Sequence, residues 1–368
     1  MTWSVMQVLH QGGGAGSVTS TLHLSLGLAG AGFHVLFVCP PGSEVEALAQ
    51  AGGLEVHSLG LVSGERRANA ARLAALMQAH PVDLVNSQSA RDRAALTWLG
   101  LTGRLRVPLV ITRRQMPRTF PLENWLASGV AARVVAVSRA VGHALVRRGT
   151  PRRKLVVIPN GLVTGRVDGS VSAAGVNQWR IRIGWEPSRR TVGIVARPKD
   201  QSVVLKALEQ VQIPVRLVLA GVNPAHHLAG LAAMVPSRHA VVCLPFDPDV
   251  RPLYELLDLV LLPSRSEGLS QALLEAMALG KPVIASNDAG NRDLVTDGID
   301  GRLVPPLDPR AWAKVIEDLL ADRQLTGSLG EAARRTARVT FALDHTIDRT
   351  ALLYRSLLES PAPAGAQR

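Results

Sequence analysis

The chain has 368 residues, of which 47% are hydrophobic and 19% charged, a composition typical of soluble globular proteins. Its length suits two packed domains, and no apolar run reaches the roughly 20 residues that span a bilayer. The first residues lack the basic start and small-residue cleavage site of a secretory signal peptide, so we expect a cytoplasmic protein.

The net charge of +12 is concentrated in the first half of the chain. Residues 1–170 hold 18 Lys and Arg against 8 Asp and Glu, whereas residues 171–368 hold 23 against 21. A basic surface favours an anionic partner, such as a phosphorylated acceptor, an acidic glycolipid, a membrane surface or a nucleic acid. An Arg-rich solvated surface explains the same excess equally well.

Short apolar runs alternate with amphipathic stretches, such as residues 65–78 and 139–148, throughout the first half. The runs that read as strands are residues 4–9, 34–39, 54–59, 82–87, 107–112, 133–138 and 155–160. This alternation predicts a parallel sheet that helices cover on both faces. Cys39 and Cys243 lie in such runs, far apart in the sequence, which predicts buried reduced thiols with neither a disulfide nor a metal site.

A glycine run follows the first strand and precedes a helix that we expect from about Ser17. Its members are Gly12, Gly13, Gly14 and Gly16. Glycines allow the backbone to approach a phosphate or a sugar closely, and they also serve simply to make tight turns. The run is not a dinucleotide-binding fingerprint, because no acidic residue ends the second strand, and this argues against a dehydrogenase.

The segment 112–125 combines basic and apolar side chains after the fifth strand. It contains Arg113, Arg114 and Arg118, followed by Phe120, Leu122 and Trp125. One interpretation is a loop that contacts an acceptor or a membrane. The other is a basic loop whose apolar residues pack down onto the protein.

Residues 162–177 interrupt the alternation, being rich in Gly, Ser and Val without helical periodicity, and we predict a domain linker there. Strand-like runs then resume at residues 191–196, 215–220, 240–245, 257–263 and 281–286. The chain is expected to be helical from Pro309 to about Ser360. The predicted domains are therefore residues 1–165 and 178–342, followed by a helix over 343–360 that packs back on the first domain and a disordered tail over 361–368.

Arg197 and Lys199 follow the first strand of the second domain. They place two cations at the carboxyl edge of that strand, where ligands of parallel α/β sheets bind. Two cations can neutralise a diphosphate leaving group without a metal ion. Lys199 also fits an ordinary surface charge. Backbone near Gly221, after the next strand, is expected to contact a nucleotide base.

Two glutamates eight residues apart mark the segment 264–286. Glu267 lies in a loop beside Gly268, and Glu275 lies inside the otherwise apolar helix that Ser270 is predicted to cap. The start of a helix offers free N–H groups to a diphosphate, while carboxylates accept hydrogen bonds from sugar and ribose hydroxyls. A loop acid and a solvated helix acid are the alternative, but a carboxylate among apolar neighbours needs a partner.

The stretch EGLSQALLEAMALGKPVIAS over residues 267–286 resembles the donor-binding signature of the retaining glycosyltransferases of family 4. Residues 287–305 and 134–161 are similar to the same family. The resemblance implies a GT-B fold, which is an α/β architecture of two Rossmann-like domains with parallel sheets facing across a cleft. It also implies retention of anomeric configuration and no cofactor or metal beyond the nucleotide-sugar.

The resemblance assigns roles to individual residues. Glu267, Arg197 and Lys199 would act in catalysis on the donor sugar and diphosphate. The donor-binding residues would be Glu275, Gly268, Leu269, Ser270, Gly13, Gly14, Gly16 and Gly221. Acceptor binding would involve Arg113, Arg114 and Gln88.

This sequence departs from the family pattern in two places. The loop between Arg197 and Lys199 is shorter than usual, and Lys-Gly is not found there. Arg114 and Gln88 stand where many members carry histidines, and an arginine cannot act as a base near neutral pH. These changes fit an acidic or phosphorylated acceptor, or a subfamily with altered chemistry.

We therefore predict a glycosyltransferase that uses a nucleotide-sugar donor and acts in cell-envelope polysaccharide or glycolipid synthesis, with peripheral membrane contact through its basic half. One alternative is a nucleotide-sugar epimerase on the same fold, which needs no acceptor. Another is a basic nucleic-acid-binding protein, although the sequence lacks a helix-turn-helix, RNA-binding aromatic pair or zinc motif, so no nucleic-acid partner is expected.

Overall fold

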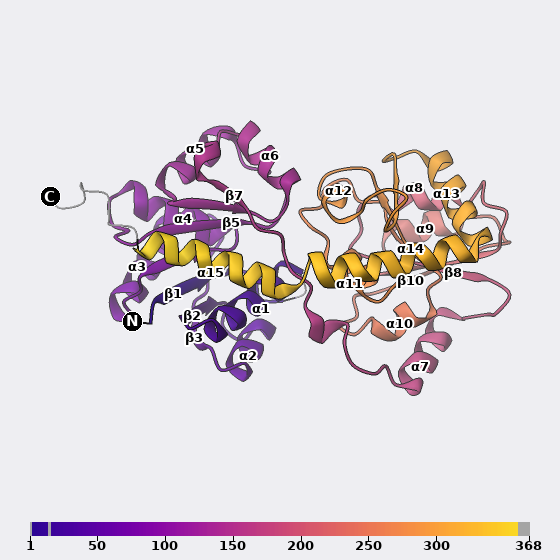
Figure 1. Cartoon of the computed structure of the whole chain (residues 1–368), viewed down its shortest axis with the longest axis horizontal. Coiled ribbons are helices and arrows are strands. Elements are labelled where there is room, and N and C mark those ends of the chain that lie inside the picture. Colours follow the sequence, from indigo (N-terminus) through magenta and orange to yellow (C-terminus); the bar gives the residue numbers. More distant parts are fainter. Residues whose placement is uncertain (1, 14–15, 360–368) are drawn as a thin grey trace. The chain divides into compact units, whose positions relative to one another are not determined.

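The computed structural model describes residues 2–13 and 16–359. It divides into two compact units, one comprising Met1–Gly161 with Leu343–Arg368 and the other Leu162–Ala342 (Figure 1). Gly14 of the glycine run and the tail over 361–368 lie outside the described residues. No helix in the described part of the chain is both long and apolar enough to cross a bilayer.

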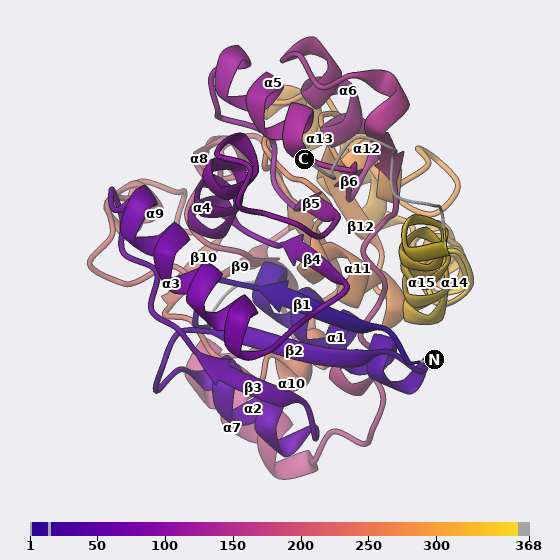
Figure 2. The ribbon, with the colours of Figure 1, turned by 90° about the vertical axis from the view of Figure 1, so that its left-hand side faces the viewer.

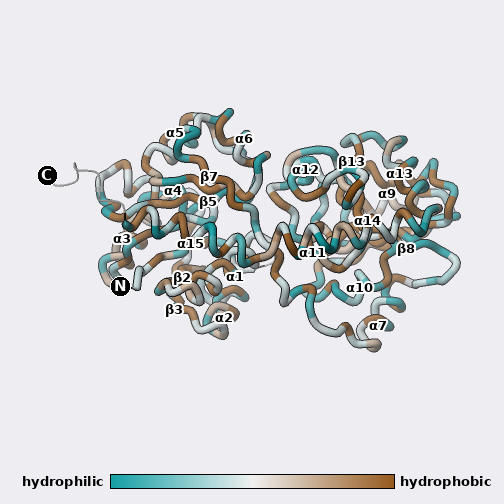
Figure 3. The backbone as a smooth tube through the Cα atoms, in the orientation of Figure 1, coloured by the Kyte–Doolittle hydropathy of each residue, from teal (hydrophilic) through white to brown (hydrophobic). Residues whose placement is uncertain are grey.

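The first unit is built on a parallel sheet of seven strands, in the order β3-β2-β1-β4-β5-β6-β7 (Figure 2). The strands are β1 (Ser4–Val8), β2 (His34–Cys39), β3 (Glu55–Ser58), β4 (Leu84–Ser87), β5 (Leu109–Arg113), β6 (Arg133–Ala136) and β7 (Leu155–Val157). Most positions of the central strands are buried, because helices cover both faces. In Figure 3 the backbone around β2 and β7 is coloured hydrophobic.

Two layers of helices cover this sheet. Helix α1 (Gly16–Gly30) contacts α2 (Glu44–Ala51) and α15 (Leu343–Glu359) on one side. On the other side α3 (Arg66–Ala79) contacts α4 (Ala90–Leu101), which contacts α5 (Pro121–Val130), and α6 (Arg139–Arg147) packs near β6 and β7. Figure 2 shows α3 and α4 opposite α1 and α15. The core of the α1 side includes Phe37, Leu28 and Tyr354.

The second unit is built on a parallel sheet of six strands, in the order β10-β9-β8-β11-β12-β13. The strands are β8 (Arg190–Val195), β9 (Val215–Ala220), β10 (Ala240–Leu244), β11 (Leu259–Leu262), β12 (Val283–Ser286) and β13 (Arg302–Val304). The helices are α7 (Ala173–Ile183), α8 (Ser202–Ala207), α9 (His227–Ala232), α10 (Arg251–Leu256), α11 (Gln271–Ala278), α12 (Asn291–Leu294), α13 (Pro309–Ala321) and α14 (Arg323–Arg335). Trp312 of α13 is fully buried in its core.

The two parallel-sheet α/β units confirm the predicted fold class. Each of the twelve runs predicted as strands overlaps one, and β13 is the described strand that those runs omit. Parallel strands end at one edge of a sheet, so the loops after β8, β9 and β11 share the carboxyl edge of the second unit. Both cysteines are free thiols, as predicted. Cys39 is buried, and burial raises the pKa of its thiol to about 11, whereas Cys243 is only half-buried.

The prediction of a linker over residues 162–177 is wrong. Leu162, Val163 and Val167 are buried in the second unit, and a short 3-10 helix covers Thr164–Arg166. Helix α7 already begins at Ala173, because Ser172 caps it by accepting a hydrogen bond from the Gly175 amide at 3.0 Å. The Gly- and Ser-rich composition masked this capping signal.

Candidate functional site

The loops after β8 and β11 lie side by side at the carboxyl edge of the second sheet, because these two strands are hydrogen-bonded neighbours. Lys199 in the first loop forms an ion pair with Glu267 in the second. Asp200 accepts hydrogen bonds from the Arg265 guanidinium at 3.1 Å and from its amide at 3.0 Å. The fold thus brings together two of the residues predicted to act in catalysis, Lys199 and Glu267.

The loop after β8 is held in a tight turn by Gln201, a residue that no pattern in the sequence indicated. The side chain of Gln201 is 1% exposed. Its amide nitrogen donates to the carbonyl oxygen of Arg197 at 2.8 Å, and its oxygen accepts from the amide of Lys199. This turn presents the exposed side chains of Arg197 and Lys199 at the same edge. The short loop that departs from the family pattern therefore still places both cations there.

Gly221 follows β9 and reaches the same edge. Its φ of +98° is one that L side chains rarely adopt, and a Cβ there would lie 2.8 Å from the carbonyl oxygen of Ala196. Glycine is therefore required at position 221, because the loop after β9 packs directly against the backbone of Ala196, next to Arg197.

Helix α11 begins directly after the Glu267 loop. The hydroxyl of Ser270 accepts a hydrogen bond from the Leu273 amide at 3.3 Å, as expected of the predicted cap. Gly268 and Leu269 are buried where the loop turns into the helix. The free amides at this end form a partly positive site that favours an anion.

A second loop packs directly on the Glu267 loop. The amide of Gly290 donates to the carbonyl oxygen of Glu267 at 3.1 Å, and a Cβ on Gly290 would lie 1.9 Å from the carbonyl oxygen of Gly268. The fully buried Asn291 side chain donates to the carbonyl oxygens of Ser264 at 3.0 Å and Ser286 at 3.1 Å. These contacts fix the position of Glu267. In the sequence, the only indication of Gly290 and Asn291 is that they follow the strand that begins after Pro282.

Glu275 lies in α11 and is 6% exposed. Its Oε1 accepts a hydrogen bond from Nε of Arg166 at 2.5 Å, so the partner that a carboxylate among apolar residues requires is Arg166. Burial raises the pKa of Glu275, and Arg166 opposes that effect. The buried Tyr254 hydroxyl donates to the carbonyl oxygen of Ala272 at 3.1 Å on the same helix. Sequence reasoning missed Arg166 because it belongs to the segment assigned to a linker.

In the first unit the glycine run packs against α2. A Cβ on Gly12 would lie 2.8 Å from Cβ of Ser43, and one on Gly13 would lie 2.7 Å from Oε2 of Glu44. Gly16 is the first residue of α1. These close approaches explain the glycines at 12 and 13 by packing, and their role toward a donor stays a prediction.

Gln88 and Arg114 meet in a buried polar network at the carboxyl ends of β4 and β5. Arg114 is 8% exposed and donates through Nε to Oε1 of Gln88 at 3.1 Å and through a terminal nitrogen to Asn160. Gln88 donates to Gln7 at 2.7 Å. Burial lowers the pKa of Arg114 to about 10, which leaves it charged at neutral pH. Its acceptor-binding role stays a prediction.

Arg113 points away from this network. Its guanidinium donates to Oδ1 of Asn124 on α5 at 2.9 Å. Burial, together with the charge of nearby Arg93, lowers the pKa of Arg113 to about 9. Strand residues alternate in direction, so the two neighbouring arginines of the sequence belong to different sites.

His10 is a further candidate that the sequence did not single out. It follows β1, and its Nδ1 lies 2.6 Å from the hydroxyl of Ser89 and 3.3 Å from the buried carboxylate of Asp92. Asp92 also accepts from the Gln88 amide at 2.8 Å. A lone histidine gives no sequence signal, because its partners lie about 80 residues later.

The apolar residues after Arg118 are not packed down. Phe120 is 80% exposed, Leu122 66% and Trp125 56%, and all three lie at the start of α5. Exposure excludes the interpretation of a packed basic loop for these three side chains, and contact with an acceptor or a membrane stays a prediction.

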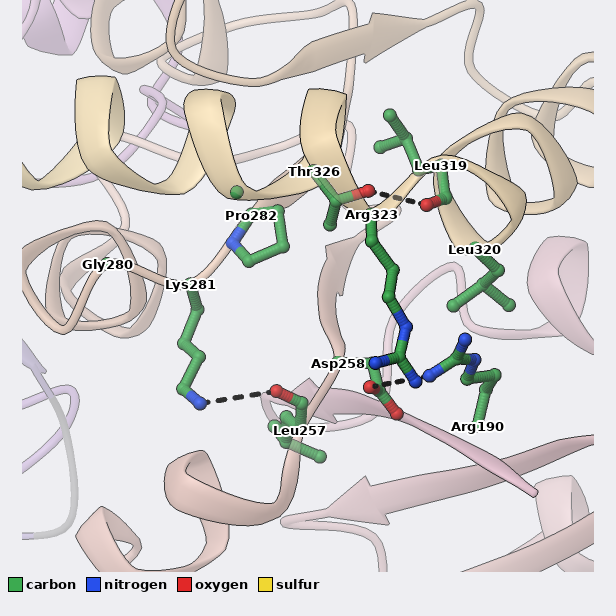
Figure 4. A pocket seen from close by; sticks show the side chains of 11 residues that line it. Arg190, Leu257, Asp258, Gly280, Lys281, Pro282, Leu319, Leu320, Arg323 and Thr326 are labelled. Carbon is green, nitrogen blue, oxygen red and sulfur yellow. Dashed lines mark hydrogen bonds and ion pairs between the residues drawn. The ribbon is translucent and has the colours of Figure 1, made fainter. Parts of the chain in front are cut away.

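A shallow pocket of the second unit lies at the opposite, amino-terminal edge of the sheet (Figure 4). Arg190 begins β8 and pairs with Asp258 at 3.7 Å, and Lys281 donates to the carbonyl oxygen of Leu257 at 3.3 Å. These cations already have partners. The pocket is therefore separate from the Lys199–Glu267 pair.

Known proteins resemble the chain in sequence and in structure. A D-inositol 3-phosphate glycosyltransferase of Mycobacterium marinum is 32% identical over 225 residues, which are 57% of this chain and 46% of that protein. A D-inositol 3-phosphate glycosyltransferase from Segniliparus rotundus is 28% identical over 296 residues, which are 73% of this chain and 65% of that protein. The chain spans less than half the length of the first curated relatives it matches.

The fold is also that of a solved structure. The crystal structure of HepE from Anabaena with UDP and glucose aligns with a TM-score of 0.82 at 20% identity, covering 96% of this chain and 100% of that one. Two family models match in chain order: Glycosyltransferase Family 4 over residues 14–166, and Glycosyl transferases group 1 over residues 189–336. The chain therefore belongs to the group 1 glycosyltransferases of family 4.

Proposed function

We propose that this protein transfers a sugar from a nucleotide-sugar donor, and that the donor binds at the carboxyl edge of the second unit's sheet. The observation that carries the proposal is the pairing of Lys199 with Glu267 across the loops after β8 and β11, beside the start of α11. A cation, a carboxylate and a helix N-terminus at one edge suit a ligand with phosphates and hydroxyls.

The ion pair suggests how the donor is accommodated. The two negative charges of a diphosphate compete with Glu267 for the Lys199 ammonium, and Arg197 supplies a second cation from the same turn. Glu267, released from Lys199, then accepts a hydrogen bond from a sugar hydroxyl. The acceptor hydroxyl bonds to the sugar as the bond between the sugar and the phosphate breaks, and the departing phosphate takes the hydroxyl proton. The negative charge that grows on this phosphate is stabilised by the two cations.

Glu275 is proposed to bind the ribose of the donor, as the resemblance to the family implies. Arg166 holds Oε1 of this carboxylate and fixes its orientation. We propose retention of configuration, as the resemblance to the family implies, with the acceptor attacking from the face that the phosphate leaves and with no protein nucleophile. We also propose transfer without a metal, because Arg197 and Lys199 supply the positive charge that a metal would supply. The complex of HepE with UDP and glucose supports UDP as the first nucleotide to test.

The acceptor is proposed to be anionic. Arg114, in the network with Gln88, and Arg113, directed at α5, are buried cations in two separate places, and their hydrogen bonds in the described structure go to neutral amides. Each of them therefore offers a positive charge to an anion. Arg93, which is 8% exposed, lowers the pKa of Arg113 further by repulsion, and an anion would relieve that repulsion. The names of the D-inositol 3-phosphate glycosyltransferases support a phosphorylated acceptor.

The donor site is tested by thermal shift with UDP-, GDP-, ADP- and dTDP-sugars, with and without EDTA. One nucleotide series should raise the Tm by mass action in both conditions. Lys199→Ala should lower the affinity for that series by roughly 10- to 100-fold, which corresponds to the loss of one charge-assisted hydrogen bond. Lys206→Ala, an exposed lysine of α8, is the matched control and should bind normally. No shift with any series would contradict the site.

Product analysis then separates transfer from epimerisation. A transferase releases nucleotide and forms a glycoside only when an acceptor such as an inositol phosphate is present. An epimerase converts the nucleotide-sugar into a second nucleotide-sugar without any acceptor. A new nucleotide-sugar formed from the donor alone would overturn the proposed reaction while leaving the donor site intact.

A further inference from the structure

Three histidines surround one glutamate in the first unit. His34 is the first residue of β2, Glu55 is the first residue of β3, His57 follows two positions along β3, and His80 is the cap that ends α3. Because parallel strands start at the same edge, this cluster lies at the amino-terminal edge of the sheet. The glycine run, Gln88 and Arg114 follow the carboxyl ends of strands, so the cluster is separate from them.

The nitrogen atoms converge on the carboxylate. Nε2 of His57 lies 2.7 Å from Oε1 of Glu55, and Nδ1 of His80 lies 3.6 Å from the same oxygen. Nε2 of His34 lies 2.9 Å from Oε2. One ligand atom each from Glu55, His57 and His80 lies within 4.8 Å of the other two.

These spacings match a metal centre of the tetrahedral type. Zinc bonds of about 2.0 to 2.1 Å place neighbouring ligand atoms roughly 3.3 Å apart. The observed separations lie on either side of that value, at 2.7 Å for His57, which is a hydrogen bond in the described structure, and at 3.6 Å for His80. A metal ion would replace that hydrogen bond. Glu55 and His57 project from the same face of β3, because residues two apart on a strand share a face.

The cluster offers ring nitrogens and one carboxylate to a cation. The rings of His57 and His80 lie 4.1 Å apart, and a nitrogen of each lies near the Glu55 carboxylate. A metal ion binds the neutral imidazoles through their lone pairs and needs only that one carboxylate. The side chains are 18 to 49% exposed, so an ion and a completing water can enter from solvent.

We propose that Glu55, His57 and His80, with His34 beside them, bind a divalent transition-metal ion of the zinc class. Imidazole nitrogens select such ions, whereas Mg²⁺ and Ca²⁺ require oxygen ligands. The ion joins β3 to the end of α3 and stabilises this edge of the sheet. It takes no part in the proposed sugar transfer, so either proposal can fail without the other.

The test is metal binding to the full chain, prepared without a polyhistidine tag and stripped with EDTA. Dialysis against Zn²⁺ followed by elemental analysis should give one ion per chain, and Zn²⁺ should raise the Tm reversibly. His57→Ala and His80→Ala should each abolish the bound ion and the rise in Tm. Circular dichroism of each variant should show that the substitution leaves the fold intact.

A matched control is present in the second unit. His226 and His227 also stack, with ring centroids 4.2 Å apart, but they do not belong to a described three-ligand group. His227→Ala should therefore retain the ion and the rise in Tm. Co²⁺ gives an independent readout, because its visible absorption in the wild type should disappear in His57→Ala.

Two results would overturn the proposal. One is wild-type protein that binds no Zn²⁺ after dialysis. The other is His57→Ala and His80→Ala variants that bind it as the wild type does. Loss of the ion in His227→Ala alone would place the site at that pair instead and would equally overturn it.

Discussion

The Glu275 carboxylate is a single residue whose environment sets a dependence on pH. It is buried in α11 against Arg166, and burial raises its pKa above the ordinary value of 4.5. The folded state therefore binds the proton more tightly than the unfolded state. Its contribution to stability is fully present below about pH 4.5 and is lost as pH rises through the folded pKa.

Glu275→Gln removes this titration and keeps the shape of the side chain. In the variant Arg166 faces a neutral amide at every pH, as it faces a neutral carboxyl in the wild type below the folded pKa of Glu275. We expect the stability of the variant relative to the wild type to increase from about pH 4 to about pH 7, measured by urea unfolding. Glu331→Gln, an exposed carboxylate of α14, is the control. A stability difference that stays constant with pH would contradict the raised pKa.

Gly290 is a second residue with a defined consequence. Gly290→Ala places a methyl group 1.9 Å from the carbonyl oxygen of Gly268, and backbone cannot rotate away as a side chain can. We expect a loss of about 1–3 kcal/mol in the free energy of unfolding, together with weaker donor binding as the Glu267 loop moves. Urea unfolding and a donor titration measure the two effects.

A glycine with free space provides the control for this substitution. An added Cβ on Gly327, inside α14, meets nothing within 4 Å. Gly327→Ala should therefore be neutral or stabilise the protein by up to about 1 kcal/mol, because alanine favours a helix. Equal effects of the two alanines would show that the contact with Gly268 does not determine the position of the loop.

Helix α15 shows how one element can complete a unit from a distant part of the chain. Its Tyr354 is fully buried, and its hydroxyl oxygen accepts hydrogen bonds from Gln7 at 3.0 Å on β1 and from Asn86 at 2.6 Å on β4. Burial raises the pKa of Tyr354 to about 12, so the hydroxyl stays protonated at neutral pH. Thr112 of β5 donates to Asn86 at 3.1 Å and extends the network.

Tyr354→Phe removes the acceptor for two buried amide groups at once. An unsatisfied buried donor costs about 1–3 kcal/mol, so the first unit should lose about 2 kcal/mol or more. Hydrogen exchange should become faster in β1 and β4, which lie in the first unit, and should remain unchanged in β8 and β11. Uniformly unchanged exchange would show that the helix is held by apolar packing alone. Tyr254→Phe, in the second unit, is the control that should spare β1 and β4.

The packing of one segment on its unit explains the error at residues 162–177. Composition there predicts a flexible connection, yet three buried apolar residues, Leu162, Val163 and Val167, attach the segment to the second unit. Scattered apolar residues carry no periodic signal, because each packs against a surface that the segment itself does not encode. Arg166, within this segment, could therefore not be selected from the sequence.

For the molecule as a whole, the sequence determined the local features. Runs of apolar and β-branched residues located twelve of the thirteen strands, and their alternation with amphipathic stretches predicted parallel sheets. Ser270 was identified as a cap, and the Glu267 and Glu275 pair as the candidate donor site. These features depend on residues close together in the chain, so periodicity and capping chemistry suffice to predict them.

The tertiary structure alone decided which of these residues meet. Lys199 and Glu267 are 68 residues apart and pair because β8 and β11 are neighbours in the sheet. Arg166 and Glu275 are 109 residues apart and pair because the segment before α7 packs in the second unit with α11. The tertiary structure also directed Arg113 and Arg114 to different sites, and it brought His34 and His80, from other elements, to Glu55 and His57 on β3. Such contacts arise from strand order and side-chain direction, which the pattern of a single segment does not contain.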